Sequence, residues 1–310
     1  MEDKILETAG AVYHYTISDN GVSITGYEGK RSELFLPSYI EGIPVKAIEK
    51  KVFFNKSGLC RIYLPETIES IGDWAFSHCK DLEEIYLKRK YYALGKALFG
   101  ECPKLSCICL LDAKKMEPDM SITPEEKGFG TLLAAVCGIL DAPYLFQTQS
   151  IDDAEWLSLW DARMLTVLSR DDMEGYTKLL LCGEEDYGSR ENNLDFFLEQ
   201  KRRRKVRLAF LRLLHDKGLA DDNRKMLTEY LLSHTKGEES EETWLVLKEE
   251  HGEDMVYLSL FTDLGCVSLE NISDILTDLG DTNPQMKAYF MRYKEEYLGT
   301  VDFFAGLSLD

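Results

Sequence analysis

The residue types that carry acid, base and nucleophilic chemistry do not fall into a catalytic pattern in this 310-residue sequence. Its five histidines form neither an HExxH motif nor a pair four residues apart. Ser77 and Ser233 each begin an SxxK segment, but neither has the companion motifs of a serine acyltransferase. The sequence therefore predicts no catalytic residue, no enzymatic activity and no cofactor.

The eight cysteines also lack the spacing of a metal site. No CxxC pair occurs, and Cys107 and Cys109 form a CxC without a second pair or a nearby histidine to complete a zinc site. Most cysteines lie beside aliphatic residues, which is typical of buried thiols in a reducing compartment. We expect no metal ion and reduced, mostly buried thiols.

Charge is distributed unevenly along the sequence, whose net charge is −19. Residues 1–112 carry 14 Lys and Arg against 16 Asp and Glu, whereas residues 113–310 carry 22 against 39. Such different balances favour two domains. The acidic half argues against a nucleic-acid partner, because backbone phosphates need matching positive charge.

The basic cluster Lys201–Lys205 with Arg207 lies within this acidic half. Arg203, Arg204 and Arg207 would share one face of a helix. We interpret the cluster as a solvated outer face or as a contact for an acidic segment of the same chain.

No stretch of the sequence approaches the 18 apolar residues that would cross a membrane, so we expect no membrane insertion. The opening residues 1–7 are acidic and mixed, without the apolar core of a signal peptide. If Met1 is the native start, we expect a cytoplasmic protein. If a longer natural N-terminus precedes it, we expect a cell-surface or secreted protein.

A period of 23 residues organises the first third of the sequence. Residues 62–84 and 85–107 align throughout, and an earlier copy is displaced by an insertion at residues 40–45. The matching positions are Ile62 with Ile85 and Ile108, Leu64 with Leu87 and Leu110, Ile48 with Ile71 and Leu94, Phe53 with Phe76 and Phe99, and Cys79 with Cys102. Apolar residues that recur at a coil period must stack, so that each coil buries the face of its neighbour.

These repeats resemble the BspA-like leucine-rich repeats, a 23-residue class found in many bacterial proteins. The lead-in is similar too, with Tyr15-Thr-Ile, then Val22-Ser-Ile-Thr-Gly-Tyr-Glu-Gly, then Leu36-Pro-Ser-Tyr-Ile. The resemblance covers residues 11–111. It implies a solenoid with a parallel sheet along one side, and for many relatives a binding role at the cell surface.

Both ends of such a solenoid need a cover. Residues 12–17 and 22–27 alternate apolar and polar types around Asp19-Asn20-Gly21, which favours a tight hairpin turn. We expect this hairpin to cover the first coil and the chain after Leu110 to cover the last.

The middle residue of each short strand points away from the core. These positions hold Phe35, Tyr63, Tyr86 and Cys109. Because neighbouring coils lie ~4.8 Å apart, the three aromatic residues predict an exposed ladder, which is a common feature of protein interfaces. Two alternatives remain: the helical half covers this face, or the ladder only stabilises the sheet through cross-strand contacts.

Beyond residue 130 the apolar period becomes 3.6, as in the stripe of Trp156, Trp160 and Met164. Eight or so helices separated by glycine turns predict antiparallel helix pairs. The segment before them, with Pro124, Gly128 and Gly130, has the composition of a linker.

We therefore predict an α/β leucine-rich-repeat solenoid with an N-terminal β-hairpin cap, followed by an all-α helical domain. The predicted domains are a hairpin cap (1–30), a solenoid of three to four coils (31–112), a linker (113–130) and an acidic helical domain (131–310).

The predicted function is a non-enzymatic protein–protein interaction module whose binding surface is the solenoid sheet, with Phe35, Tyr63 and Tyr86 as binding residues and a protein of unknown identity as partner. One alternative is an effector or enzyme whose activity lies in the helical half, with the repeats used for targeting. A cleft there holding a His or Cys beside a carboxylate would favour it. Another is an intramolecular role, in which the three aromatic residues are inaccessible.

Overall fold

The computed structural model describes residues 3–111, 122–182 and 193–299. It divides into two compact units, residues 1–167 and 168–310, which are described separately below. The first unit holds the repeats. The domain boundaries expected from the sequence, at residues 112 and 130, stay a prediction.

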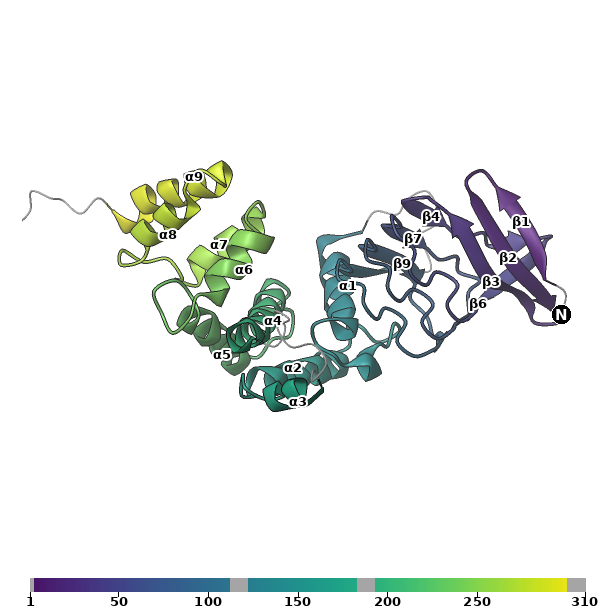
Figure 1. Ribbon diagram of the computed structural model, residues 1–310, viewed down its shortest axis with the longest axis horizontal. Helices are drawn as coiled ribbons and strands as arrows, with labels where there is room; N and C mark the ends of the chain where they lie inside the picture. The colour runs from purple at the N-terminus through teal and green to yellow at the C-terminus, as the bar shows by residue number, and fades with distance from the viewer. Residues whose placement is uncertain (1–2, 112–121, 183–192, 300–310) are drawn as a thin grey trace, which may run out of the picture. The chain divides into compact units, whose positions relative to one another are not determined.

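An antiparallel meander opens the first unit (Figure 1). Its strands are β1 (Lys4–Thr8), β2 (Ala11–Ser18) and β3 (Gly21–Gly29). The predicted hairpin is β2–β3, and Gly21 at its turn has a φ of 131°, which an L side chain rarely adopts. The strand β1 had no signal in the sequence analysis, and it extends the hairpin by pairing with β2.

Two sheets run along the solenoid, where the resemblance implied one. The first, which we call the ladder sheet, is parallel throughout and consists of β4 (Glu33–Phe35), β7 (Arg61–Tyr63), β9 (Glu84–Lys88) and β11 (Cys107–Leu111). The second, which we call the mixed sheet, continues the meander in parallel through β6 (Ile43–Ile48), β8 (Ser70–Ile71) and β10 (Ala93–Leu94), and β5 (Tyr39–Ile40) pairs with β6. The predicted leucine-rich-repeat solenoid is confirmed for the described residues, and its four ladder strands correspond to about four turns, where three to four coils were expected.

The third side of each coil is a run of turns without a helix. Residues at two positions of every repeat have a positive φ although none is glycine. They are Lys51, Trp74 and Ala97 at the first position, and Asn55, His78 and Glu101 at the second. Backbone hydrogen bonds to the next coil hold this conformation: the N–H groups of Lys51 and Asn55 donate to the carbonyls of Asp73 and Ser77.

An internal column of aromatic rings fills the solenoid. Tyr27, Phe53, Phe76 and Phe99 follow one another with centroid separations of 5.1, 5.3 and 5.5 Å. The three phenylalanines are buried at the 23-residue spacing seen in the sequence. The 23-residue period of the sequence is therefore the spacing at which the core residues recur along the solenoid.

Helix α1 (Pro124–Cys137) covers the last coil, as expected of the chain after Leu110. Residues 124–130, predicted as the end of a linker, form the first half of this helix; residues 113–121 lie outside the described residues. Thr123 and Glu126 make a reciprocal capping box, and Pro124 occupies the first helical turn. A Cβ on Gly130 would come within 2.6 Å of Cys107 Sγ, so this glycine permits close packing on β11.

The first unit is completed by η1 (Pro143–Leu145) and by α2 (Ala154–Leu168), whose last residue falls in the second unit. Trp156 and Trp160 of α2 are buried, and their indole N–H groups donate to the carbonyls of Leu145 and Leu132. The tryptophan stripe predicted from the sequence thus belongs to the core of the repeat unit.

The second unit is helical, as predicted (Figure 1). Its described helices are α3 (Tyr176–Cys182), α4 (Leu194–Leu214), α5 (Asp221–Ser233), α6 (Glu242–Glu250), α7 (Met255–Asp263), α8 (Ile272–Leu279), α9 (Pro284–Tyr293) and the π-helical turn η3 (Lys294–Leu298). Trp244, Phe261 and Phe290 are buried together in its core. Among the described residues of both units, no helix is long and apolar enough to cross a membrane.

Candidate binding surface

The outward face of the ladder sheet is a set of straight rows, because its strands pair in parallel without a register shift. Phe35 pairs with Tyr63, Tyr63 with Tyr86, and Tyr86 with Cys109. The intervening residues, such as Ile62 and Ile85, point inward and are buried.

The aromatic ladder consists of Phe35, Tyr63 and Tyr86, and its rings stack face to face. The Phe35 and Tyr63 centroids are 4.1 Å apart with 2° between the ring planes. The Tyr63 and Tyr86 centroids are 4.4 Å apart with 21° between the planes. The ring faces between neighbours are therefore occupied, and a ligand would meet ring edges along most of the row.

Accessibility falls along the ladder from the first coil to the last. Phe35 is 49% exposed, Tyr63 and Tyr86 are half-buried, and Cys109 is buried. Helix α1 closes this end, where Cys107 and Cys109 lie against each other with 3.0 Å between their sulfur atoms. Within the first unit, the ladder is thus open at β4 and covered by α1 at β11.

A row of charges flanks the ladder, and the sequence analysis missed it. Arg61 lies between two carboxylates, with 2.5 Å from its Nη1 to Glu33 Oε1 and 3.3 Å from its Nε to Glu84 Oε2. These residues occupy the position two before each aromatic residue, so the 23-residue alignment contained the signal for them.

The tyrosines of the ladder are neutral over the physiological pH range. Burial, followed by the hydrogen bond that its hydroxyl donates to Glu84 at 2.6 Å, raises the pKa of Tyr86 far above its ordinary value. Burial also raises the pKa of Tyr63. The outward face of the ladder sheet therefore presents uncharged aromatic ring edges beside the row of Glu33, Arg61 and Glu84, in which the arginine is paired with both carboxylates.

The opposite face, on the mixed sheet, has a different character. Its outward row consists of the small residues Ser23, Ala47, Ser70 and Ala93. A shallow hollow of about 390 Å³ lies along this row, beside the exposed Tyr91. With no large side chain in the row, this face offers less apolar contact area than the aromatic ladder.

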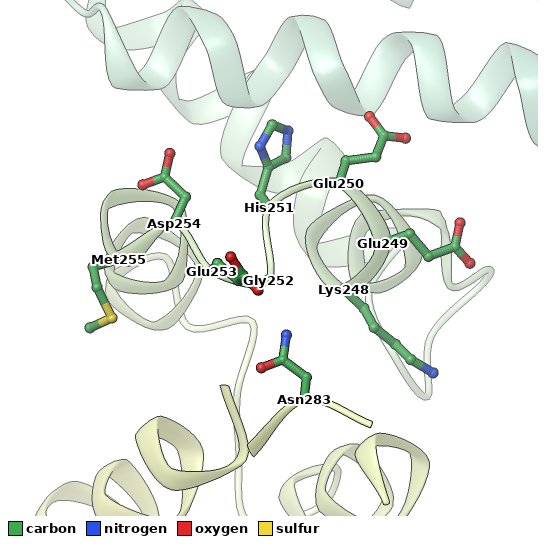
Figure 2. Close-up of a pocket in the computed structure, with 9 residues that line it drawn as sticks. All are labelled: Lys248, Glu249, Glu250, His251, Gly252, Glu253, Asp254, Met255 and Asn283. Carbon is green, nitrogen blue, oxygen red and sulfur yellow. The ribbon is translucent and has the colours of Figure 1, made fainter. Parts of the chain in front are cut away.

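The helical unit has a hollow of about 620 Å³ between the α6–α7 turn and the start of α9 (Figure 2). Its lining includes His251 together with Glu253 and Asp254, the kind of combination that would favour the enzyme alternative. The His251 ring is, however, stacked flat on Tyr257 at 3.6 Å, and burial lowers its pKa. None of the lining residues is a serine, threonine or cysteine, so the hollow offers no hydroxyl or thiol nucleophile.

The two SxxK serines have structural roles. Ser77 is buried and donates to the carbonyl of Ala97 in the next coil. Ser233 donates to the carbonyl of Tyr230 within its own helix. Among the described residues, no group of three or more His, Cys, Asp or Glu side chains is arranged to hold a metal ion.

The basic cluster on α4 contacts acidic residues of the same chain, one of the two interpretations offered from the sequence. Arg203 lies 2.6 Å from Glu249, and Arg207 binds Glu250 through two nitrogen atoms at 2.8 and 2.6 Å. The expectation that Arg203 is solvated was wrong, since it is only 8% exposed. Its burial is explained by three carboxylates that neutralise it, one four residues earlier on α4 and two more than 40 residues away in the sequence.

Coils that stack in register, with a parallel ladder on one side, define a leucine-rich-repeat solenoid. Residues 38–117 match the family described as BspA type Leucine rich repeat region, in six copies. The repeat segment of this chain is a BspA-type leucine-rich repeat region, as the resemblance implied.

Two bacterial crystal structures are similar to part of the chain. A leucine rich cell surface protein from Faecalibacterium prausnitzii A2-165 is 25% identical, with a TM-score of 0.27, over 35% of this chain and 30% of that one. A leucine rich repeat protein from T. pallidum is 28% identical, with a TM-score of 0.26, over 30% of this chain and 55% of that one. The chain thus spans less than two thirds of either protein. A comparison with curated proteins finds no match.

Proposed function

We propose that this chain is a non-enzymatic protein-binding module whose binding surface is the outward face of the ladder sheet. The observation that carries the proposal is the aromatic ladder itself, a stacked row of Phe35, Tyr63 and Tyr86 open to solvent at its first ring. Leucine-rich repeats commonly mediate protein–protein interaction, which supports the same conclusion.

The ladder is suited to binding because it is rigid before a partner arrives. Its strands are held in parallel register on both sides of β7, and each ring is fixed by its neighbour. A partner that contacts such a surface loses little additional side-chain freedom from this chain. Aromatic side chains with one polar atom, such as tyrosine, are also enriched among residues that dominate binding energy.

Charge compensation supports a protein partner over a strongly charged ligand. The guanidinium of Arg61 is paired with Glu33 and Glu84, and the tyrosines are neutral, so the face carries no excess of positive charge for an anionic polymer. Uncharged aromatic edges beside a compensated row resemble the centre of a protein interface, where charged residues are depleted.

Site-specific photo-crosslinking tests this proposal. The full chain carries p-benzoylphenylalanine at position 63 or, as a matched control on the mixed sheet, at position 70, and is irradiated in a lysate of its source cells. We expect a discrete protein adduct from position 63 and none from position 70. Excess wild-type chain should suppress the adduct, and the Tyr63→Ala/Tyr86→Ala variant should compete at least about tenfold less well.

Two outcomes would contradict the proposal. Adducts of equal yield from both positions would indicate non-specific contact. A double variant that competes as well as the wild-type chain would show that the ladder does not contribute to binding.

A further inference from the structure

The ladder sheet has one open edge, and it lies at the most exposed end of the aromatic ladder. The strand order is β11-β9-β7-β4, so β4 pairs on one side alone, whereas α1 covers the other end at β11. An unpaired strand edge presents backbone groups that can accept another strand.

The hydrogen-bond pattern of β4 shows which groups are available. In a parallel ladder, alternate residues direct both their N–H and C=O groups to the same neighbouring strand. The carbonyl of Ser32 and the N–H of Leu36 bond to β7, which assigns Leu34 to that side as well. The backbone groups of Glu33 and Phe35 therefore point to the open edge, and among the described residues no backbone hydrogen bond engages them.

The side chains of the same two residues are also accessible. Phe35 stacks on Tyr63 through one face of its ring, and its 49% exposure leaves the other face open. Glu33 is exposed, and one of its two carboxylate oxygens pairs with Arg61. The open edge thus combines main-chain groups, a free aromatic face and a carboxylate within three residues.

The β7 strand, which pairs with the other edge of β4, indicates which side chains complement Glu33 and Phe35. The β7 strand places Arg61 beside Glu33 at 2.5 Å and Tyr63 on Phe35 at 4.1 Å, in a parallel register. Because the ladder repeats from coil to coil, a strand added outside β4 would meet the same two side chains at the same spacing. The matching segment carries a basic residue two positions before an aromatic residue.

We propose that β4 is a strand-addition site, at which an extended segment of a partner protein adds in parallel, with a basic side chain beside Glu33 and an aromatic ring on Phe35. This inference rests on the proposed function, since it identifies the chemistry of the partner at the open end of the same surface. It differs from the proposed function in that main-chain hydrogen bonds, in addition to side-chain contacts, bind the partner.

A synthetic peptide that copies residues 58–66, with serine in place of Cys60, is the probe. It supplies the Arg-Ile-Tyr spacing of β7, and a control peptide with the Arg and Tyr exchanged has the same composition. We expect the first peptide to bind the full chain at least about fivefold more tightly, measured by fluorescence anisotropy. The order of the two residues matters because a parallel strand meets Glu33 before Phe35.

Variants of the chain separate the contributions of the edge. Glu33→Pro removes an outward N–H without touching the β4–β7 bonds made by Leu34 and Leu36, and proline is tolerated on edge strands. We expect at least about a tenfold loss of peptide affinity for Glu33→Pro and for Phe35→Ala. Glu33→Gln keeps the N–H and should lose less. If Glu33→Pro fails to fold, slowed hydrogen exchange of residues 33–36 in the wild-type chain on adding the peptide supplies the same test.

Several results would overturn strand addition. One is peptide binding that survives Glu33→Pro but is lost in Tyr86→Ala, which would move the contact to the sheet face and leave the proposed function standing. Another is no peptide binding while position 63 still crosslinks to a partner. Self-association of the wild-type chain that Glu33→Pro abolishes would make a second copy the occupant, against the proposal.

Discussion

The two compact units bury their large side chains by different means. In the repeat unit, neutral rings stack in a column, with Phe53, Phe76 and Phe99 separated by 5.3 and 5.5 Å along the solenoid. The helical unit has an aromatic core of its own, but it also buries charged side chains in pairs. Lys205 of α4 is 6% exposed and lies 2.7 Å from Asp172.

This difference decides how far each unit could be understood from its sequence. The aromatic column repeats at the coil period, so the position of one ring in the sequence predicts the position of the next. An ion pair joins residues without a fixed spacing, such as Arg202 with Asp172 and Arg203 with Glu249, which are 30 and 46 residues apart. The same contrast predicts that the stability of the repeat unit is most sensitive to lost packing, whereas that of the helical unit is also sensitive to the loss of buried charge pairs.

Truncation of the internal column should have the largest effect. Phe76→Ala removes a fully buried ring that contacts rings on both sides, and we expect the free energy of unfolding of the repeat unit to fall by about 3–5 kcal/mol. Urea denaturation followed by hydrogen exchange and mass spectrometry reports each unit separately. The exposed Glu66→Ala should change stability by less than about 0.5 kcal/mol, and an equal effect of both variants would show that the column is not the core.

Removal of the half-buried carboxylate of Asp172 should have the next largest effect, confined to the helical unit. Asp172 accepts hydrogen bonds from Lys205 at 2.7 Å and Arg202 at 3.0 Å, so Asp172→Ala leaves a buried ammonium group without its counter-ion. We expect a loss of about 2–3 kcal/mol. Lys225→Ala, which breaks an exposed pair with Glu229, is the control and should cost below about 0.5 kcal/mol.

Acid should weaken the helical unit before the repeats. Burial alone would raise the pKa of Asp172, but the hydrogen bonds from Lys205 and Arg202 outweigh it and hold the pKa below its ordinary value. A lowered pKa in the folded state means that the stabilisation is complete above about pH 4 and is lost as the pH falls further. The hydrogen bond from Arg203 lowers the pKa of Glu249 in the same way.

The measurement is the free energy of unfolding of each unit between pH 5 and pH 2. In the described part of the repeat unit, two carboxylates have lowered pKa values, Glu41 and Asp81. Both are more exposed than Asp172, so they should make the stability of the repeat unit depend less steeply on pH. Asp172→Asn should flatten the profile of the helical unit. A profile for the variant as steep as that of the wild-type chain would rule out this pair as the source.

Much of the repeat unit followed from periodicity in the sequence. The period placed Ile62 and Ile85 inward and predicted that Phe35, Tyr63 and Tyr86 share one row, all of which the structure contains. The hairpin cap followed from alternation around an Asn-Gly turn.

Other features of that unit had no signal in residue type. Trp74 adopts a positive φ, which a bulky side chain rarely takes, in a turn where its N–H donates to the carbonyl of Lys96 in the next coil. Composition assigns Gly130 to a linker, whereas in the structure the absence of a side chain allows α1 to approach β11. Composition alone cannot distinguish a glycine that makes the backbone flexible from one that allows two elements to pack closely.

The smallest stability effect, and the one that distinguishes the two aromatic columns, is expected for Tyr63→Ala. Tyr63 stacks on two rings, as Phe76 does, but it is half-buried on the surface of the sheet. We expect its removal to cost about 1 kcal/mol of unfolding free energy, far less than Phe76→Ala, because the edge of the Tyr63 ring is already in contact with water. If the ladder exists to bind a partner, crosslinking from position 35 should nevertheless fall at least about tenfold in this variant. A cost equal to that of Phe76→Ala, with crosslinking unchanged, would instead support the alternative that the ladder only stabilises its own sheet.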